Sequence, residues 1–168
     1  MLAIKADGTI RETVSGEQYI NNPADQRPRE GAIEFLTAVK KKGYSIYVVT
    51  NQGGIARGYK SLKSAIEEQI ITLELFPMVR AVCMADDYST SNFWFIDRRG
   101  QRKVRGPLGV KARMPEPGML LYLETLWSAD QGRHWVIGNS ADDEGAAANA
   151  EWDFLHIDEA LKIGHLPE

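Results

Sequence analysis

The chain has 168 residues, of which 43% are hydrophobic and 26% are charged, and its formal net charge is -3. This length and composition are typical of one soluble domain with a sizeable core, and the net charge excludes a chain that is basic throughout like many nucleic-acid-binding proteins. The single cysteine, Cys83, excludes an intrachain disulfide framework and a multi-cysteine zinc site. No apolar run reaches the length of a membrane span, so we expect a soluble, cytoplasmic protein that does not contact membranes.

Strand and helix patterns alternate along the chain. An apolar strand over Leu2–Ala6 precedes a polar loop or short hairpin, which leads to a helix over Glu30–Lys42 with Ile33, Leu36 and Val39, together with Phe35, on its apolar face. Further strands are expected at Ser45–Thr50, Val79–Met84, His134–Gly138 and Asp153–Ile157, and further helices at Leu62–Leu75, Pro117–Ala129 and Asp142–Ala150. This alternation predicts an α/β fold with a parallel sheet, whose ligands bind beyond the carboxyl ends of the strands.

Four segments follow those strand ends or sit close to them. Each also has an ordinary structural reading: a Gly-rich turn, an acidic helix start, or a turn built from prolines. The four segments are Lys5-Ala6-Asp7-Gly8-Thr9, the TNQGGIARG stretch of residues 50–58, Arg113-Met114-Pro115-Glu116-Pro117-Gly118-Met119, and Gly138-Asn139-Ser140-Ala141-Asp142-Asp143. Taken singly, none of them identifies a function.

Together and in this order, the segments resemble the four motifs of the haloacid dehalogenase superfamily of phosphatases. The TNQGGIARG stretch is similar to the branch that contains histidinol-phosphate, heptose-bisphosphate and polynucleotide 3'-phosphatases. The resemblance implies a three-layer Rossmann-like fold with a parallel sheet and a small cap or hairpin insertion. It covers nearly the whole chain, so we expect one domain over residues 1–168, with an insertion at about 86–112.

The resemblance also implies a mechanism and its residues. A first Asp attacks phosphorus, a second acts as general acid and base, Mg²⁺ is held by carboxylates, and a hydroxyl and a Lys hold the phosphate. The family-equivalent catalytic positions are Lys5, Asp7, Thr50, Met114, Asn139 and Asp143. Three of these positions depart from the pattern, because Lys5 stands in place of the nucleophile, Met114 in place of the phosphate-binding Lys, and Asn139 in place of an Asp.

These departures change the expected chemistry. An ammonium cannot replace a carboxylate as both nucleophile and metal ligand, and losing a nucleophile typically costs many powers of ten in rate. Lys5 can instead supply the positive charge that the metal would bring, so that Asp143 is a remnant of a lost metal site and no cofactor is expected. If Lys5 is misaligned, it is simply a strand-end lysine whose side chain reaches solvent.

Phosphate and nucleic-acid contacts are the remaining candidates. The groups placed to bind phosphate or another ligand are Thr50, Asn51, Gly53, Arg57 and Arg113. A basic hairpin follows over residues 93–105, and its aromatic and basic side chains are of the kind that stack bases and hold phosphates. Its candidate nucleic-acid contacts are Trp94, Arg98, Arg99, Arg102 and Lys103. Packing of the aromatic residues on the domain is the alternative.

The functional expectation is a phosphatase homologue that has lost catalytic carboxylates and is inactive or impaired as an enzyme. It would bind a phosphorylated small molecule, a nucleic-acid end or a partner protein. The alternative is an active phosphomonoesterase, acting on polynucleotide 3'-phosphates or sugar phosphates through a rearranged site, with Mg²⁺ as its cofactor.

Overall fold

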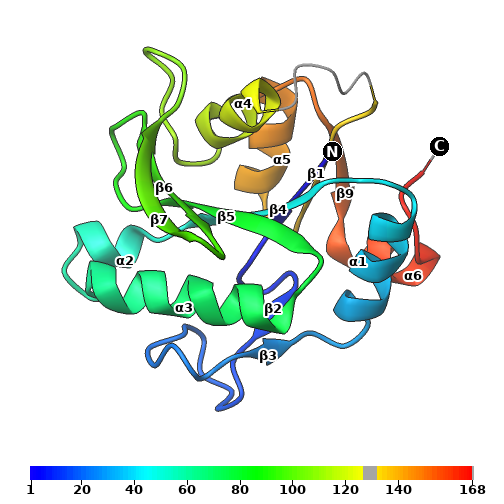
Figure 1. Cartoon of the computed structure of the whole chain (residues 1–168), viewed down its shortest axis with the longest axis horizontal. Coiled ribbons are helices and arrows are strands. Elements are labelled where there is room, and N and C mark those ends of the chain that lie inside the picture. Colours follow the sequence, from blue (N-terminus) through cyan, green and yellow to red (C-terminus); the bar gives the residue numbers. More distant parts are fainter. Residues whose placement is uncertain (127–131, 168) are drawn as a thin grey trace.

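The computed structural model describes residues 1–126 and 132–167, and its centre is a mostly parallel β-sheet (Figure 1). Within these residues the main sheet has seven strands in the order β7-β6-β5-β4-β1-β8-β9. The strands are β1 (Leu2–Lys5), β4 (Ile46–Asn51), β5 (Val79–Ala85), β6 (Asn92–Asp97), β7 (Gly100–Arg105), β8 (Trp135–Gly138) and β9 (Asp153–His156). The predicted α/β fold with a parallel sheet is confirmed.

Strands β9, β8, β1, β4 and β5 run parallel to one another, whereas β6 continues the sheet antiparallel to β5, and β7 pairs antiparallel with β6. Strand β1 lies between β4 and β8. The carboxyl ends of these three neighbours therefore meet at one edge, which brings the segments after Lys5, Asn51 and Gly138 together. The basic hairpin expected from the sequence is the β6–β7 pair, with Gly100 at its turn.

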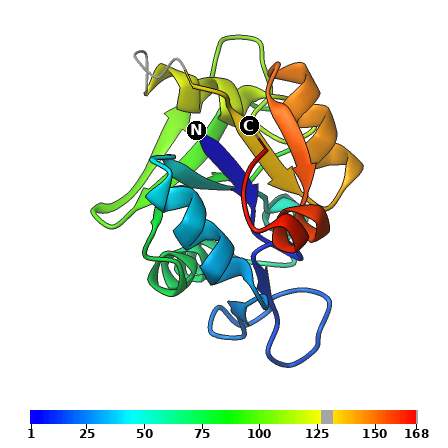
Figure 2. The ribbon, with the colours of Figure 1, turned by 90° about the vertical axis from the view of Figure 1, so that its right-hand side faces the viewer.

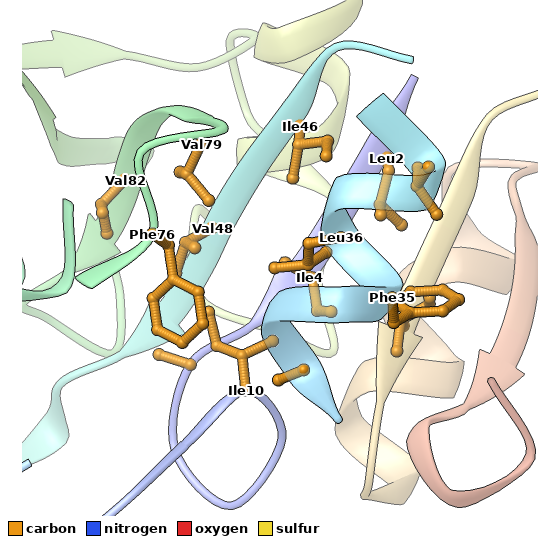
Figure 3. Close-up of a cluster of buried hydrophobic side chains, with 14 of the residues drawn as sticks. Leu2, Ile4, Ile10, Phe35, Leu36, Ile46, Val48, Phe76, Val79 and Val82 are labelled. Carbon is orange, nitrogen blue, oxygen red and sulfur yellow. The ribbon is translucent and has the colours of Figure 1, made fainter. Parts of the chain in front are cut away.

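Helices cover both faces of the sheet (Figures 1 and 2). One face carries α1 (Ala32–Lys41), α3 (Leu62–Leu75) and α6 (Ile157–Ile163), and the other carries α4 (Gly118–Thr125) and α5 (Ala141–Asn149). Successive residues of β4 point to opposite faces of the sheet. Ile46 and Val48 belong to the hydrophobic cluster shared with α1 (Figure 3), whereas Tyr47 and Val49 belong to the cluster on the face that α4 and α5 cover. Burial on both sides explains the unbroken apolar run of this strand.

The sequence expectations differ from the structure at Ile33 and at two helices that were not expected. Ile33 was placed on the apolar face of α1, but its side chain is 39% exposed, and the face is formed by Ala32, Phe35, Leu36 and Val39. The Gly-rich stretch contains a short helix, α2 (Gly53–Ala56), and a last helix, α6, follows β9. The expected helix over Pro117–Ala129 is α4, and the part of that prediction after residue 126 lies outside the described residues.

The polar segment after β1 forms a small separate hairpin, in which β2 (Arg11–Glu12) pairs with β3 (Arg27–Pro28). It lies beyond the carboxyl end of β1, below the sheet in the view of Figure 1. Among the described residues, none of the helices combines the length and apolar character required to cross a membrane.

Candidate functional site

Lys5 ends β1 with its ammonium directed at the start of α5. Its Nζ donates to Ser140 Oγ at 3.0 Å and lies 3.3 Å from Asp143 Oδ2. The Lys5 side chain is 22% exposed, whereas that of Asp143 is 1% exposed. The position after an apolar strand that the sequence singled out therefore holds a cation paired with a buried carboxylate.

Asp143 is held by the start of its own helix. Its Oδ2 accepts hydrogen bonds from the backbone N–H groups of Asn139 and Ser140, each at 3.0 Å, and from Ser140 Oγ at 2.7 Å. Gly138 makes this possible, because a side chain there would place Cβ 2.4 Å from Asp143 Cβ. The second oxygen, Oδ1, is buried and has no hydrogen-bond partner among the described residues. Asp143 is thus both a helix cap and the anion that Lys5 pairs with.

Asp7 lies two residues beyond Lys5, in a tight turn that includes Gly8 at a φ of 68°. Its Oδ1 accepts from Arg11 Nε at 3.0 Å and from Arg11 Nη2 at 2.8 Å, and its Oδ2 accepts from Gln52 Nε2 at 3.3 Å. Asn139 joins the turn, because its Nδ2 donates to the Gly8 carbonyl at 3.1 Å. The turn at Asp7 and the start of α5 are therefore joined directly.

Two arginines, Arg57 from the Gly-rich stretch and Arg113 from the segment before α4, meet at the ring of Tyr88. Arg113 lies over the ring of Tyr88 at 4.2 Å, and Arg57 approaches the same ring at 5.3 Å. A Cβ on Gly53 would lie 2.3 Å from Tyr88 Oη and 3.1 Å from Arg113 Nη1, so glycine allows both groups to approach the backbone. Arg113 Nη1 is buried without a hydrogen-bond partner in the described part of the chain.

Two expected site residues have structural contacts of their own. Asn51 uses its whole amide on the backbone of Met114, with Nδ2 donating to the Met114 carbonyl at 3.0 Å and Oδ1 accepting from the Met114 N–H at 3.1 Å. The Met114 side chain is only 2% exposed and packs with Met119, Leu120 and Leu123 of α4. Met114 therefore extends the core, and Asn51 fixes the segment that precedes α4.

These elements surround one cavity of about 790 Å³. Its lining includes Lys5, Asp7, Thr50 and Asn139 from around the strand ends, and Tyr19 and Tyr59 from the surrounding loops. Of the expected catalytic and phosphate-binding positions, the lining includes Lys5, Asp7, Thr50, Asn51, Gly53, Arg57, Arg113 and Asn139. Met114 and Asp143 do not line the cavity.

The candidate nucleic-acid contacts lie elsewhere, on β6, on β7 and at the turn between them, and none of them lines this cavity. Trp94 Nε1 and Lys103 Nζ both bind Asp86 Oδ2, at 2.9 and 3.3 Å. Arg98 donates to four carbonyl oxygens around the end of α3, and Arg102 pairs with Asp97. Their role in binding nucleic acid stays a prediction, with Arg99 the most weakly tied of the five.

The donor set around Lys5 does not suit Mg²⁺, which takes oxygen ligands in near-octahedral geometry. The nearest carboxylate oxygen, Asp143 Oδ2, already accepts three hydrogen bonds and faces an ammonium. Across residues 1–126 and 132–167, no three His, Cys, Asp or Glu side chains converge as metal ligands. An ammonium at this position would repel a divalent cation.

Sequence reasoning missed three residues of the site: Arg11, Gln52 and Tyr88. Arg11 follows Asp7 by four residues, but only the turn at Gly8 brings its guanidinium back to that carboxylate. Gln52 lies within the quoted Gly-rich stretch and was passed over. Tyr88 comes from the loop after β5, and its position over Gly53 carried no signal in the sequence.

Comparison with known proteins agrees with this architecture. The family model for polynucleotide kinase 3 phosphatase matches residues 2–161. The D-glycero-beta-D-manno-heptose-1,7-bisphosphate 7-phosphatase of Rhodopseudomonas palustris is 30% identical over 150 residues, covering 86% of this chain and 75% of that protein. The corresponding enzyme of Pseudomonas putida is 28% identical over 149 residues, covering 88% and 75%.

Solved structures show the same fold. A protein described as a HAD-like phosphatase from Mesorhizobium loti has a TM-score of 0.68 and 26% identity, covering 90% of this chain and 68% of that one. The D,D-heptose 1.7-bisphosphate phosphatase of B. bronchiseptica, solved with magnesium and phosphate, has a TM-score of 0.62 and 20% identity, covering 99% and 88%. The expectation that no cofactor is used has no support from these relatives.

The family model spans nearly the whole chain, and the fold and strand-end motifs agree with it. The resemblance noted from the sequence is therefore confirmed at the level of the superfamily and fold, while loss of activity is not shown by it. The chain belongs to the polynucleotide kinase 3 phosphatase family, within the haloacid dehalogenase superfamily of phosphatases.

Proposed function

We propose that this chain binds a phosphate monoester, with a phosphorylated sugar as the first candidate, and does not turn it over through an aspartyl-phosphate. The observation that supports this most directly is the pair formed by Lys5 and Asp143, 3.3 Å apart. A protonated, paired lysine has no lone pair for attack on phosphorus, and it takes up the carboxylate that would otherwise bind a metal. The inherited reaction then lacks both its nucleophile and its metal site.

The same pocket keeps groups that suit a phosphate. Beside Gly53, Arg113 presents a buried nitrogen that has no hydrogen-bond partner among the described residues, and a guanidinium can bind two phosphate oxygens at once. Lys5, which also lines the cavity, adds a second positive charge. Arg113 thereby compensates for Met114, which is buried in the core instead of reaching the ligand.

The sugar is suggested by the relatives, whose names give a heptose bisphosphate as their substrate. A cavity of about 790 Å³ is large for a phosphate alone and falls within the range of sites that enclose small molecules. Its outer wall offers polar and aromatic side chains from Gln18, Tyr19 and Tyr59, which suit hydroxyl groups and ring faces. Nucleic-acid ends and protein partners stay as further ligands to test.

Calorimetry with a set of sugar phosphates, run in EDTA and again with Mg²⁺, tests this proposal. We expect binding in EDTA that Mg²⁺ does not strengthen, and no release of phosphate. Arg113→Met should weaken binding at least tenfold, which corresponds to the loss of a charged hydrogen bond of about 1.5–3 kcal/mol. Arg105→Met, on the exposed edge strand β7, is the matched control and should bind normally. Binding that requires Mg²⁺ would contradict the proposal.

A second candidate is an active phosphomonoesterase, and the names of the relatives favour it directly. Asp7 is the carboxylate next to Lys5 on the cavity wall, so it is the group that would have to act. Phosphate release from a panel of monoesters, including 3'-phosphorylated oligonucleotides, distinguishes the two candidates. If the native chain turns over with Mg²⁺ and Asp7→Asn abolishes the activity, this second candidate replaces the first.

A further inference from the structure

Arg11 is a fully buried cation that faces the site. Its side chain has no exposed surface, yet its guanidinium bonds to Asp7, which lines the cavity and is 46% exposed. Both Nε and Nη2 donate to the same oxygen of Asp7, at 3.0 and 2.8 Å. A buried arginine that directs two donors at one carboxylate oxygen limits how that carboxylate can turn.

The far side of Arg11 is held equally firmly. Nη2 also pairs with Glu68 Oε1 at 2.5 Å, and Glu68 is itself buried and bound by Lys60. Nη1 donates to Gln26 Oε1 at 3.2 Å and to Thr72 Oγ1. These partners come from α3 and from the segment before β3, so Arg11 is fixed by two elements outside the turn that carries Asp7.

Among the described residues, Arg11 and Gln52 hold both oxygens of the Asp7 carboxylate. Oδ1 accepts twice from Arg11, and Oδ2 accepts from Gln52 Nε2 at 3.3 Å. A general acid must instead carry a proton and point it at the leaving-group oxygen. In this arrangement Oδ1 is directed at the buried guanidinium of Arg11 and Oδ2 at the amide of Gln52, so the orientation of the carboxylate is set by its protein partners.

We propose that Arg11 is a positioning residue that holds the Asp7 carboxylate in a fixed orientation and so withholds it from the leaving-group oxygen. This inference rests on the proposed function and deepens it. Two changes then oppose catalysis: Lys5, Met114 and Asn139 replace family residues, and Arg11 fixes the orientation of Asp7. Restoring the first three residues alone then leaves the hydrolysis of substrates with poor leaving groups blocked.

The test compares leaving groups. The restored variant Lys5→Asp, Met114→Lys, Asn139→Asp is made with and without Arg11→Met, and kcat/KM is measured with Mg²⁺ on p-nitrophenyl phosphate and on glycerol 2-phosphate. An aryl leaving group needs little protonation, whereas an alkyl one needs a general acid, which is worth about 10²–10⁴ in rate. We expect Arg11→Met to raise the glycerol phosphate rate at least tenfold and to leave the aryl rate within about threefold.

Two further variants separate positioning from simple structural damage. Arg27→Met removes an arginine from the exposed pair with Glu12 on the same small hairpin and should not change the ratio of the two rates. Arg11→Lys keeps the charge but loses the paired donors, so its ratio should lie between those of the parent and Arg11→Met. If Arg11→Met does not fold, Glu68→Gln is combined with it, because Glu68 would otherwise be a buried carboxylate that has lost its arginine partner.

The outcomes are distinct for the two proposals. An unchanged ratio in the Arg11 variants overturns the role of Arg11 and leaves the proposed function standing. If the native chain itself hydrolyses phosphate, the proposed function fails, and the same ratio measured in the native chain with and without Arg11→Met decides the role of Arg11. If no chain turns over, the carboxyl ¹³C resonance of Asp7 decides it: a signal that moves on Arg11→Met supports the inference, and one that stays overturns it.

Discussion

The Nζ of Lys5 lies 3.3 Å from Oδ2 of Asp143, and the two residues are 138 positions apart in the chain. They end neighbouring parallel segments, with Lys5 on β1 and Asp143 in the first turn of the helix after β8. Because Asp143 is almost fully buried and its Oδ1 has no partner in the described residues, Lys5 supplies the main neutralising charge for this carboxylate.

Replacing Lys5 therefore affects stability as well as binding. Lys5→Met leaves Asp143 buried beside an apolar group, and we expect a loss of about 2–3 kcal/mol in the free energy of unfolding. In Lys5→Met, Asp143→Asn the charge is gone, so the double variant should be more stable than Lys5→Met alone. Urea denaturation of the native chain, Lys5→Met, Asp143→Asn and the double variant measures the coupling. Lys63→Met, on the exposed surface of α3, should stay within about 0.5 kcal/mol of the native chain.

The amide of Asn51 is expected to hold the segment before α4. Asn51→Ala leaves the N–H and the carbonyl of Met114 without their partners, at a cost of about 2 kcal/mol. Arg113 precedes Met114 directly, so its guanidinium should also lose its fixed position. We expect a lower melting temperature together with weaker sugar phosphate binding. A variant that melts earlier but binds normally would show that Arg113 is positioned by Tyr88 alone.

Asp87 is expected to make the stability of the loop that carries Tyr88 depend on pH. The backbone N–H and the hydroxyl of Ser89 donate to its Oδ1 at 2.7 and 2.8 Å, and these bonds lower the pKa of Asp87 below its ordinary value of 3.8. A lowered pKa in the folded state means that the stabilisation is fully present above that ordinary value and is lost as the pH falls through the folded-state pKa. Asp87→Ala should therefore have a lower urea midpoint than the native chain at pH 7, and the difference between the two midpoints should shrink toward pH 3. A difference that is constant with pH would exclude these bonds as its cause.

Arg98 is expected to act in stability more than in nucleic-acid binding. It donates to the carbonyl oxygens of Leu73, Phe76, Pro77 and Val79, which surround the end of α3. Arg98→Met should cost about 1–2 kcal/mol, whereas Arg99→Met should cost less than about 0.5 kcal/mol. Binding of a labelled oligonucleotide at several salt concentrations provides the second measurement. If the oligonucleotide binds and its binding depends on Arg98 alone, then nucleic-acid binding, and not the bonds to the carbonyl oxygens at the end of α3, is the main role of Arg98.

Much of the fold followed from local patterns. The buried strand over Ser45–Thr50 and the helix over Leu62–Leu75 were placed within a residue or two, because an unbroken β-branched run and a capped helix each carry their signal within a few residues. Ile33 was assigned wrongly, because helical periodicity does not say which edge of the apolar stripe stays exposed.

Helix α2 was missed for a different reason. Glycine is a poor helix former, so Gly53 and Gly54 indicated a turn, whereas the backbone continues for one helical turn after β4. Three of the four quoted segments follow β1, β4 and β8 as expected, whereas the segment at residues 113–119 precedes α4 and follows no strand directly.

The sequence by itself determined the fold class, the family resemblance and the identity of the residues that stand at each motif position, because these depend on periodicity and on residue type. The pairing of Lys5 with Asp143, the burial of Met114 in the core, and the capture of Asp7 by Arg11 were decided only by the tertiary structure. Each of these depends on which way a side chain turns after its strand ends. That direction is set by neighbours from distant segments, which no local pattern encodes.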